Sequence, residues 1–531
     1  MWVAIPPTIV AVQEIVLPPK GCRRKFEDSE SRDLLAPSAD YLGPVLCTLF
    51  IQLEGANAHM TSAESVYRRS PQWLQTALLN VHAWRIGKHR FGPRLEAAVN
   101  GLLERERWPA SQMRSYQDER IRAMVLLAHE KSPYYRKLMA EVGVHPTDIR
   151  GAADLPKLPL LTKETIRSQG EDLLTERRHR RSWVEGHTSG TTGSPLALWY
   201  DRETCVMTNA VDYRQKRWAG MGHEDWIAMF LGRVVVPPQQ TAPPFWRANV
   251  VHRQLWCSSF HLSGSNLEHY VDEIRRRGIR FLEGYPSTLY IIAKHLTGQG
   301  RTLPMQAVFS SSETLHTIQR EAIETAFGCP LFDFYGHAER VLFATECEYH
   351  AGKHLSEEFG YCELVDEDGQ PVRDGETGYL VGTSLHNTAM PMLRYRTGDL
   401  SALEVGACPC GRTSRRIRNV TTKAEDTVVT PDGRLISPSI LTHPFKPFDQ
   451  IIESQIIQTR IDHLLVKVVP SAEFTDVDEQ KLIAGLRERL GPEVHVQIER
   501  VTEIPREASG KFRWVISHVD HSCRVRWQDG V

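Results

Sequence analysis

One short segment concentrates hydroxyl side chains and glycines in the way that a phosphate-binding loop does. Residues 188–195 run Thr-Ser-Gly-Thr-Thr-Gly-Ser-Pro. Glycines let backbone N–H groups approach phosphate oxygens, and the hydroxyls add further donors. The segment is not a Walker loop, because no Gly-Lys-Ser/Thr follows at the required spacing. We predict that it holds a triphosphate, with an ordinary surface loop as the alternative. The predicted ligands are Thr188, Ser189, Gly190, Thr191, Thr192 and Gly193.

Three later segments place charged and aromatic side chains in compact motifs. Residues 334–339 run Phe-Tyr-Gly-His-Ala-Glu, residues 395–400 run Tyr-Arg-Thr-Gly-Asp-Leu, and residues 505–513 run Pro-Arg-Glu-Ala-Ser-Gly-Lys-Phe-Arg. Their order and spacing, taken with the hydroxyl-rich loop, resemble the signatures of the adenylate-forming superfamily. That superfamily includes acyl-CoA synthetases, nonribosomal adenylation domains and luciferases.

Within this superfamily, the segment from about residue 60 to about residue 520 is most similar to the phenylacetate-CoA ligase branch. The similarity is greatest to relatives found with capsular polysaccharide genes. Residues 284–287, 311–315 and 408–413 carry that similarity. The resemblance implies an AMP-forming carboxylate ligase. Such an enzyme activates a carboxylic acid with ATP and Mg²⁺, releases pyrophosphate, and passes the acyl group to an acceptor, for which coenzyme A is the expected choice.

The resemblance also implies roles for single residues. Lys511 would bridge carboxylate and phosphate oxygens, because two anions that react need positive charge between them. Glu339 would hold Mg²⁺, a hard ion that binds carboxylates and substrate phosphates. Tyr335 would face adenine and Asp399 would accept hydrogen bonds from the ribose. The other implied nucleotide contacts are Ser312, Glu313, Gly336 and Lys423. A surface-loop lysine and ordinary strand-end packing are the alternatives.

Two positions depart from the superfamily pattern. Leu196 follows the phosphate loop where many relatives carry lysine. Residues 420–426 occupy the place of a Gly-Arg-x-x-Asp hinge but have Thr for Gly and Lys423 for Arg, which keeps the charge and loses the planar fork. If a hinge operates here, Glu425 or Asp426 is where a small C-terminal domain would turn.

Cysteine and histidine side chains from two separated segments form a candidate zinc set. Cys347, His354, Cys408 and Cys410 supply three thiolates and one imidazole, which complete a tetrahedral Zn²⁺ site. Similar cysteines in the phenylacetate ligase branch suggest a structural metal, and His354 matches a histidine of that branch. His350 is the rival ligand, and unligated buried thiols are the alternative.

The elements expected to position these residues belong to an α/β protein. Short apolar runs at 226–231, 281–282, 307–309 and 331–335 alternate with helical stretches at 286–296 and 311–327, which predicts a mostly parallel sheet. Residues 116–130 predict an amphipathic helix. β-rich runs and one helix between 451 and 498 predict a separate α+β unit.

From these patterns we expect four regions. They are an irregular extension at 1–59 that is either disordered or non-native, a large ATP- and substrate-binding domain at 60–420, a mobile C-terminal lid at 421–520, and a tail at 521–531.

Composition limits the classes of partner. Lys and Arg total 64 and Asp and Glu total 65, so the balance of charge gives no reason to expect nucleic acid or an anionic membrane. No apolar run is long enough to cross a bilayer, and ten scattered cysteines favour reduced thiols and a cytoplasmic location. The sequence does not indicate which carboxylic acid is the substrate or which oligomeric state the protein adopts. A noncatalytic nucleotide-binding paralogue, or a zinc-stabilised scaffold in a polysaccharide biosynthesis complex, is the alternative function.

Overall fold

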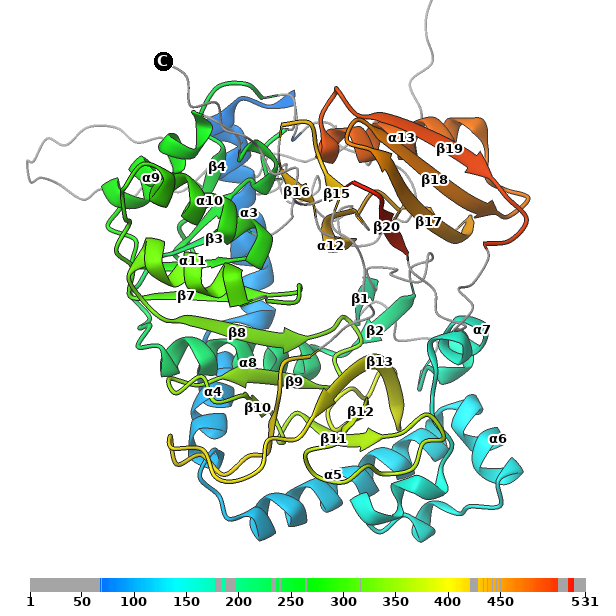
Figure 1. Cartoon of the computed structure of the whole chain (residues 1–531). Coiled ribbons are helices and arrows are strands. Elements are labelled where there is room, and N and C mark those ends of the chain that lie inside the picture. Colours follow the sequence, from blue (N-terminus) through cyan, green and yellow to red (C-terminus); the bar gives the residue numbers. More distant parts are fainter. Residues whose placement is uncertain are drawn as a thin grey trace, which may run out of the picture. The chain divides into compact units, whose positions relative to one another are not determined.

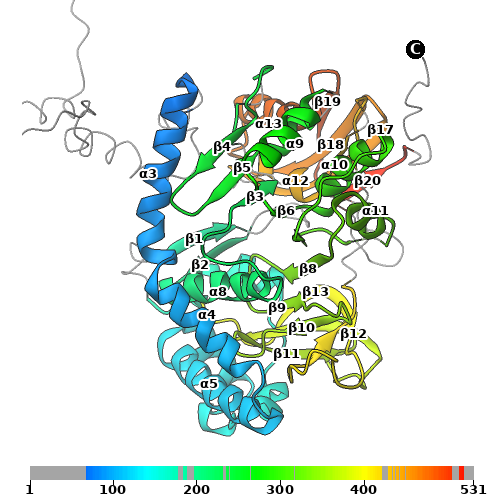
Figure 2. The same ribbon diagram turned by 90° about the vertical axis from the view of Figure 1, so that its left-hand side faces the viewer.

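The protein is described by a computed structural model (Figures 1 and 2). The described residues are 67, 69–176, 183–187, 196–230, 235–237, 240–262, 265–315, 317–420, 428–432, 434–436, 438–441, 443–445, 447–448, 450–504 and 514–519. The predicted extension at 1–59 and the tail at 521–531 lie outside them.

Helices precede the first described strand. They are α3 (Gln72–Arg90), α4 (Pro93–Arg105), α5 (Ala110–Lys131), α6 (Pro133–Glu141) and α7 (Lys163–Leu173), with short 3₁₀ turns at Pro146–Asp148 and Ala152–Lys157. The amphipathic pattern at 116–130 falls within α5, whose buried side chains include Ile121, Met124 and Val125. Thr162 caps α7 by accepting a hydrogen bond from the Thr165 backbone N–H.

Nine strands of the described residues form one sheet in the order β14-β10-β9-β8-β7-β6-β3-β5-β4. Neighbouring strands among β5, β3, β6, β7 and β8 run parallel, and β4, β9, β10 and β14 are antiparallel additions at the two edges. The strands are β3 (Ile227–Phe230), β4 (Trp246–Asn249), β5 (Gln254–Cys257), β6 (Phe281–Gly284), β7 (Ala307–Ser311), β8 (Leu331–Gly336), β9 (Phe343–Glu346), β10 (Lys353–Leu355) and β14 (Arg416–Ile417).

Helices connect these strands, as the alternating pattern predicted. They are α8 (Arg202–Trp218), α9 (Asn266–Arg276), α10 (Pro286–Gly298) and α11 (Thr317–Phe327), and a short 3₁₀ turn lies at Ser259–His261. The α/β class and the parallel centre of the sheet are therefore confirmed. The helix predicted at 311–327 begins six residues late, because Ser311 ends β7 and Ser312 adopts a left-handed φ of 69° that a helix cannot continue.

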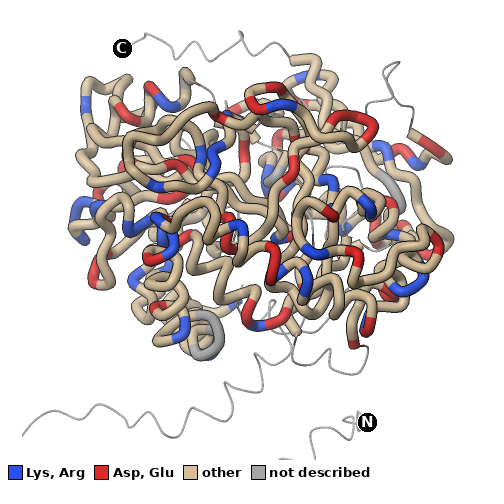
Figure 3. The backbone as a smooth tube through the Cα atoms, turned by 90° about the horizontal axis from the view of Figure 1, so that it is seen from below, with Lys and Arg blue, Asp and Glu red and all other residues tan. Residues whose placement is uncertain are grey.

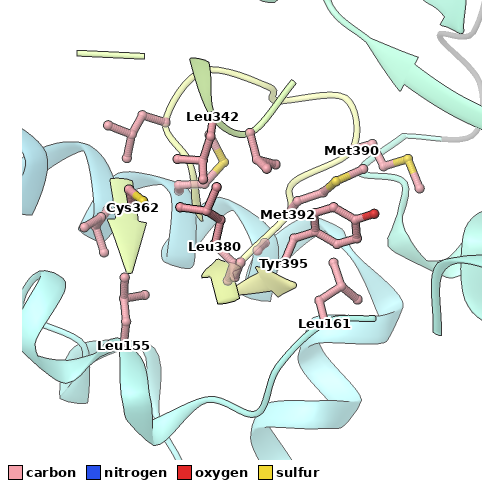
Figure 4. Close-up of a cluster of buried hydrophobic side chains, with 14 of the residues drawn as sticks. Leu155, Leu161, Leu342, Cys362, Leu380, Met390, Met392 and Tyr395 are labelled. Carbon is pink, nitrogen blue, oxygen red and sulfur yellow. The ribbon is translucent and has the colours of Figure 1, made fainter. Parts of the chain in front are cut away.

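Two smaller sheets complete the large domain. β1 (Val184–His187) pairs with β2 (Ala197–Tyr200), and β12 (Thr377–Ser384) lies between β11 (Gly360–Val365) and β13 (Tyr395–Ala402). A buried cluster joins these strands to the N-terminal helices. Figure 4 shows part of it, with Leu161, Leu380, Met392 and Tyr395 pointing into the same apolar space.

The C-terminal part has its own sheet, in the order β19-β18-β17-β20. Its elements are β15 (Val428–Val429), β16 (Leu435–Ile436), α12 (Pro438–Leu441), a 3₁₀ turn at His443–Phe445, β17 (Ile451–Arg460), β18 (His463–Pro470), α13 (Asp476–Leu490), β19 (His495–Arg500) and β20 (Val515–Ser517). Trp514 is fully buried in its core and donates a hydrogen bond from Nε1 to Ser454 Oγ over 3.1 Å. This α+β arrangement is the one that the sequence predicted beyond residue 451.

Charged residues of both signs are interspersed along the described backbone (Figure 3), in line with the near-neutral composition. Within the described residues, no helix combines the length and the apolar character that crossing a membrane requires.

Candidate functional site

Two of the predicted motifs meet where β8 and β13 approach each other. Tyr335, near the end of β8, donates a hydrogen bond from its hydroxyl to Asp399 Oδ2 over 2.8 Å. The Thr-Gly-Asp segment of β13 is fixed locally, because the Asp399 N–H donates to Thr397 Oγ1 over 3.1 Å. Gly398 has a φ of 88°, a conformation that glycine adopts without strain. The expected adenine and ribose contacts thus lie together.

Burial shapes the protonation of this pair. Burial raises the pKa of the Asp399 carboxyl, opposed by the charge of His337 and by the hydrogen bond from Tyr335. Burial also raises the pKa of Tyr335 well above its usual value, and the neighbouring Asp399 carboxylate adds to the effect. Tyr335 therefore stays protonated and acts as a donor, leaving Asp399 the acceptor that a ribose hydroxyl requires.

Glu339 lies just beyond the end of β8 and is only 4% exposed. Tyr395 donates its hydroxyl to Glu339 Oε1, Lys163 Nζ lies 3.9 Å from the same oxygen, and His337 Nδ1 lies 3.3 Å from Oε2. Burial opposes ionisation, but the His337 contact and the charge of Lys163 outweigh it and lower the pKa of Glu339 to about 2. Glu339 is thus a buried carboxylate that stays charged, which suits a hard cation.

The glycine of the aromatic-Gly motif is required by packing. A Cβ on Gly336 would lie 2.5 Å from a ring carbon of Phe343 on the paired strand β9. Any larger residue would force the rings of Phe343 and Phe334 to move.

The turn after β7 joins a second pair of predicted segments. The Glu313 carboxylate accepts a hydrogen bond from the Ser287 N–H over 3.0 Å and another from the Ser287 hydroxyl over 3.1 Å. Glu313 therefore links the turn to the first residues of α10. This arrangement positions Ser312 and Glu313 beside the carboxyl ends of the parallel strands, where α/β proteins bind ligands.

Several predicted site residues lie outside the described part of the chain. They are Thr188, Ser189, Gly190, Thr191, Thr192, Gly193, Lys423, Glu425, Asp426 and Lys511. The hydroxyl-rich segment lies in the sequence between β1 and β2, which pair with each other from Val184–Tyr200 to His187–Ala197. Leu196, which replaces the lysine of many relatives, is 3% exposed and belongs to the buried apolar cluster.

Lys163, His337 and Tyr395 are the functional candidates that the sequence did not single out. The backbone of Leu161 pairs with β13, since its N–H donates to the Arg394 carbonyl over 3.0 Å and its carbonyl accepts from Arg396 over 2.9 Å. This pairing brings Lys163, the first residue of α7, to Glu339. His337 and Tyr395 lie inside the quoted motifs, so the sequence already pointed to the segments that carry them. Lys163 is distant in sequence from Glu339, and no motif indicated it.

The predicted zinc ligands converge. The ligand atoms of Cys347, His354, Cys408 and Cys410 all lie within 4.8 Å of one another, and all four residues are buried. Cys347 Sγ is 3.7 Å from Cys408 Sγ, and Cys410 Sγ is 3.4 Å from His354 Nε2. Three thiols and one imidazole in this space fit the tetrahedral chemistry of structural zinc.

The two candidate histidines differ in their partners. His354 Nδ1 lies 3.0 Å from Ser414 Oγ, which orients the ring and leaves Nε2 toward the thiols. His350 Nδ1 instead lies 3.1 Å from the carboxylate of Glu346. The geometry therefore favours His354, as the sequence did.

The architecture defines the class of protein. A 2-hydroxyisobutyryl-CoA ligase, solved in complex with 2-HIB-AMP and CoA in the thioesterification state, matches with a TM-score of 0.54 and 21% identity, covering 78% of this chain and 91% of that chain. An open conformation of the same ligase matches with a TM-score of 0.50, covering 78% and 93%. The fold is that of the adenylate-forming acyl-CoA ligases.

Sequence relatives narrow this class. Protein CapK of Staphylococcus aureus is 25% identical over 466 residues, which are 86% of this chain and 99% of that protein. A phenylacetate-coenzyme A ligase of Thermus thermophilus is 27% identical over 450 residues, 78% of this chain and 98% of that enzyme. The family model that describes the CapK C-terminal domain matches residues 428–518 of this chain. The chain is a homologue of CapK and of the phenylacetate-CoA ligases.

These relatives confirm the predicted resemblance, and they agree with the predicted class of AMP-forming ligase. The roles of single site residues and the domain boundaries stay predictions.

Proposed function

We propose that this protein activates a carboxylic acid with ATP as an acyl-adenylate and then transfers the acyl group to the thiol of coenzyme A. The observation that carries the proposal is Glu339, a buried carboxylate with a lowered pKa beside the Tyr335–Asp399 pair. The proposal draws further support from homologues named phenylacetate-coenzyme A ligase and from the fold shared with a ligase solved with an acyl-AMP and CoA.

The proposed reaction has two steps. A carboxylate oxygen of the acid bonds to the α-phosphorus of ATP while the bond from that phosphorus to the β-bridging oxygen breaks, so pyrophosphate leaves. The sulfur of coenzyme A then bonds to the acyl carbon, its proton is released, and AMP leaves. In the first step Lys511 would neutralise the meeting oxygens, and Tyr335 and Asp399 would hold the nucleoside.

Magnesium fits Glu339, because a buried, ionised carboxylate is the type of ligand that this ion takes. Bound there with the phosphates, Mg²⁺ would offset their negative charge. Tyr395 and Lys163 hold the Glu339 carboxylate in place through its Oε1 atom.

We also propose that Cys347, His354, Cys408 and Cys410 hold a structural Zn²⁺. Four protein donors complete the tetrahedral set of a structural zinc site, so the ion would brace the fold and take no part in the reaction.

Carboxylate-dependent ATP–pyrophosphate exchange tests the first step. Purified protein is assayed with a panel of aryl, fatty, hydroxy and amino acids, beginning with aryl acids because of the named relatives. We expect exchange with at least one class, its loss in Glu339→Gln, and its retention in the matched control Glu141→Gln, an exposed residue of α6. A coenzyme A thioester, detected by mass, tests the second step. ATP binding without exchange for any acid would favour the noncatalytic alternative.

A further inference from the structure

A cavity separate from the nucleotide-site candidates lies beside the cysteine–histidine cluster. Its volume is about 240 Å³, and α4, α5, α8 and the segments 357–361 and 412–415 line it. None of its lining residues is a predicted nucleotide or zinc ligand, although Ser414 contacts the zinc-ligand candidate His354. Exposed residues of α5, such as Ala110 and Arg114, form part of its wall, so the cavity communicates with solvent.

The wall of this cavity carries more positive than negative charge. Five arginines and three glutamates line it, an excess of two positive charges. The arginines are Arg105, Arg114, Arg214, Arg412 and Arg415, and the glutamates are Glu106, Glu357 and Glu358. Positive charge in a concave, partly buried site attracts anions more strongly than the same charge on an open surface.

Some of these charges are already paired. Glu357 Oε1 accepts from Arg415 Nε over 2.6 Å. Glu106 Oε2 accepts from the indole N–H of Trp218 over 2.8 Å. These two carboxylates are therefore engaged with neighbours, and Arg412 Nη1 donates to Glu348, which does not line the cavity, over 2.8 Å.

Four polar atoms of residues that line the cavity have no hydrogen-bond partner among the described residues. They are the Nε atoms of Arg105, Arg214 and Arg412 and the Oε2 atom of Glu358. Arg214 and Glu358 are each 2% exposed, and they pair with each other only through Arg214 Nη1 and Glu358 Oε1, over 2.9 Å. Arg412 Nε lies 3.3 Å from Glu106 Oε2 without forming a hydrogen bond. Buried polar atoms left in this way are costly unless a ligand or water satisfies them.

We propose that this cavity binds a phosphate dianion, either free monohydrogen phosphate or a small phosphomonoester whose organic group carries a hydroxyl. The oxygens of a tetrahedral phosphate accept from the guanidinium N–H groups of Arg105, Arg214 and Arg412. The O–H of monohydrogen phosphate, or the added group of an ester that carries a hydroxyl, donates to Glu358 Oε2. Sulfate has the same shape and charge but no proton for Glu358, so the site discriminates against it.

Phosphate bound here ties together three parts of the chain. Arg105 belongs to α4, Arg214 to α8, and Arg412 follows Cys410 in the cysteine–histidine segment. A ligand that binds only the folded state raises its stability by mass action, so phosphate raises the melting temperature as its concentration rises.

Calorimetric titration tests the proposal. Inorganic phosphate, glycerol 3-phosphate and sulfate are titrated in turn at about pH 8, where monohydrogen phosphate predominates. Saturating ATP, with no carboxylic acid added, occupies the nucleotide site throughout. We expect one phosphate per chain, sulfate at least about tenfold weaker, and binding weakened about tenfold by Arg105→Gln, which removes a charged donor. The tighter of the two phosphate ligands identifies free phosphate or the ester as the source.

Two further variants guard against misfolding as an explanation. Arg114→Gln alters an exposed arginine of the cavity wall and should also weaken binding, whereas Arg94→Gln changes an exposed arginine of α4 that does not line the cavity and should leave it unchanged. Absence of binding, equal affinity for sulfate, or an equal effect of Arg94→Gln and Arg105→Gln would overturn the proposal. The exchange assay of Glu339→Gln reports on the proposed ligase independently of these outcomes.

Discussion

Among the described residues, Lys163 is the lysine whose charge lies close to the Glu339 carboxylate. We expect Lys163→Ala to lower the efficiency of pyrophosphate exchange by roughly tenfold or more, because a charged partner of a buried carboxylate is lost. The effect should fall mainly on the KM for Mg-ATP, and Lys163→Arg, which keeps the charge, should restore part of it.

The control for this prediction is Lys157→Ala, at an exposed lysine of the preceding 3₁₀ turn that pairs with Asp154. Lys157→Ala should leave exchange at the level of the unmodified protein. Unchanged kinetics in Lys163→Ala, with an unchanged melting temperature, would remove Lys163 from the site.

The charge of Glu339 leads to a prediction about pH. Its pKa is lowered from 4.5 to about 2, so the carboxylate stays ionised at any pH above its ordinary value. The stabilisation from ionised Glu339 is fully present above pH 4.5 and is lost as the pH falls through the folded-state value near 2. We therefore expect the Glu339→Gln variant to lose the same fraction of the exchange activity at every pH from neutral to mildly alkaline.

This prediction is checked by measuring the exchange rates of the Glu339→Gln variant and of the unmodified protein together along a pH series. A ratio that changes steeply between mildly acidic and neutral pH would mean that Glu339 titrates there, and that His337 and Lys163 do not hold its charge.

At the scale of elements, the cysteine–histidine cluster connects the strand β10 and the segments on either side of it. His354 lies in β10, Cys347 follows β9, and Cys408 and Cys410 precede β14. We expect one equivalent of zinc in the purified protein and a fall of several degrees in melting temperature in Cys408→Ser, because metal binding contributes directly to folding free energy. Metal analysis and thermal unfolding measure both effects.

Cys329→Ser is the matched control, since Cys329 is partly buried and lies outside the cluster. Its zinc content should equal that of the unmodified protein. His350→Ala should also keep the metal, whereas His354→Ala should lose it; the reverse result would exchange the two histidines in the proposed site.

The sequence predicted elements where local pattern decides the structure. α10 begins at Pro286 and β8 spans the predicted 331–335, because proline at a helix start and a buried apolar run are local signals. The start of α11 was wrong, because the Ser312 turn depends on the link between Glu313 and Ser287. Lys163 was also missed because its position depends on a contact between segments that are distant in the sequence. Only the pairing of Leu161 with β13 brings Lys163 to Glu339.

At the scale of the whole molecule, the residues of the proposed reaction come from two domains. Glu339, Tyr335 and Asp399 belong to the large domain, while Lys511 lies in the segment matched by the CapK C-terminal domain. If the C-terminal domain turns between the two half-reactions, Lys511 serves adenylation alone.

We therefore expect Lys511→Ala to separate the two half-reactions. Pyrophosphate exchange should fall by about 100-fold or more, in line with the loss of a charge-stabilising donor. Conversion of supplied acyl-adenylate and coenzyme A to thioester and AMP should continue at a near-normal rate. Lys481→Ala, at a half-exposed lysine of α13 that pairs with Asp478, controls for charge loss in the same domain. Equal loss of both half-reactions in Lys511→Ala would instead place Lys511 in a single, fixed site that serves the whole reaction.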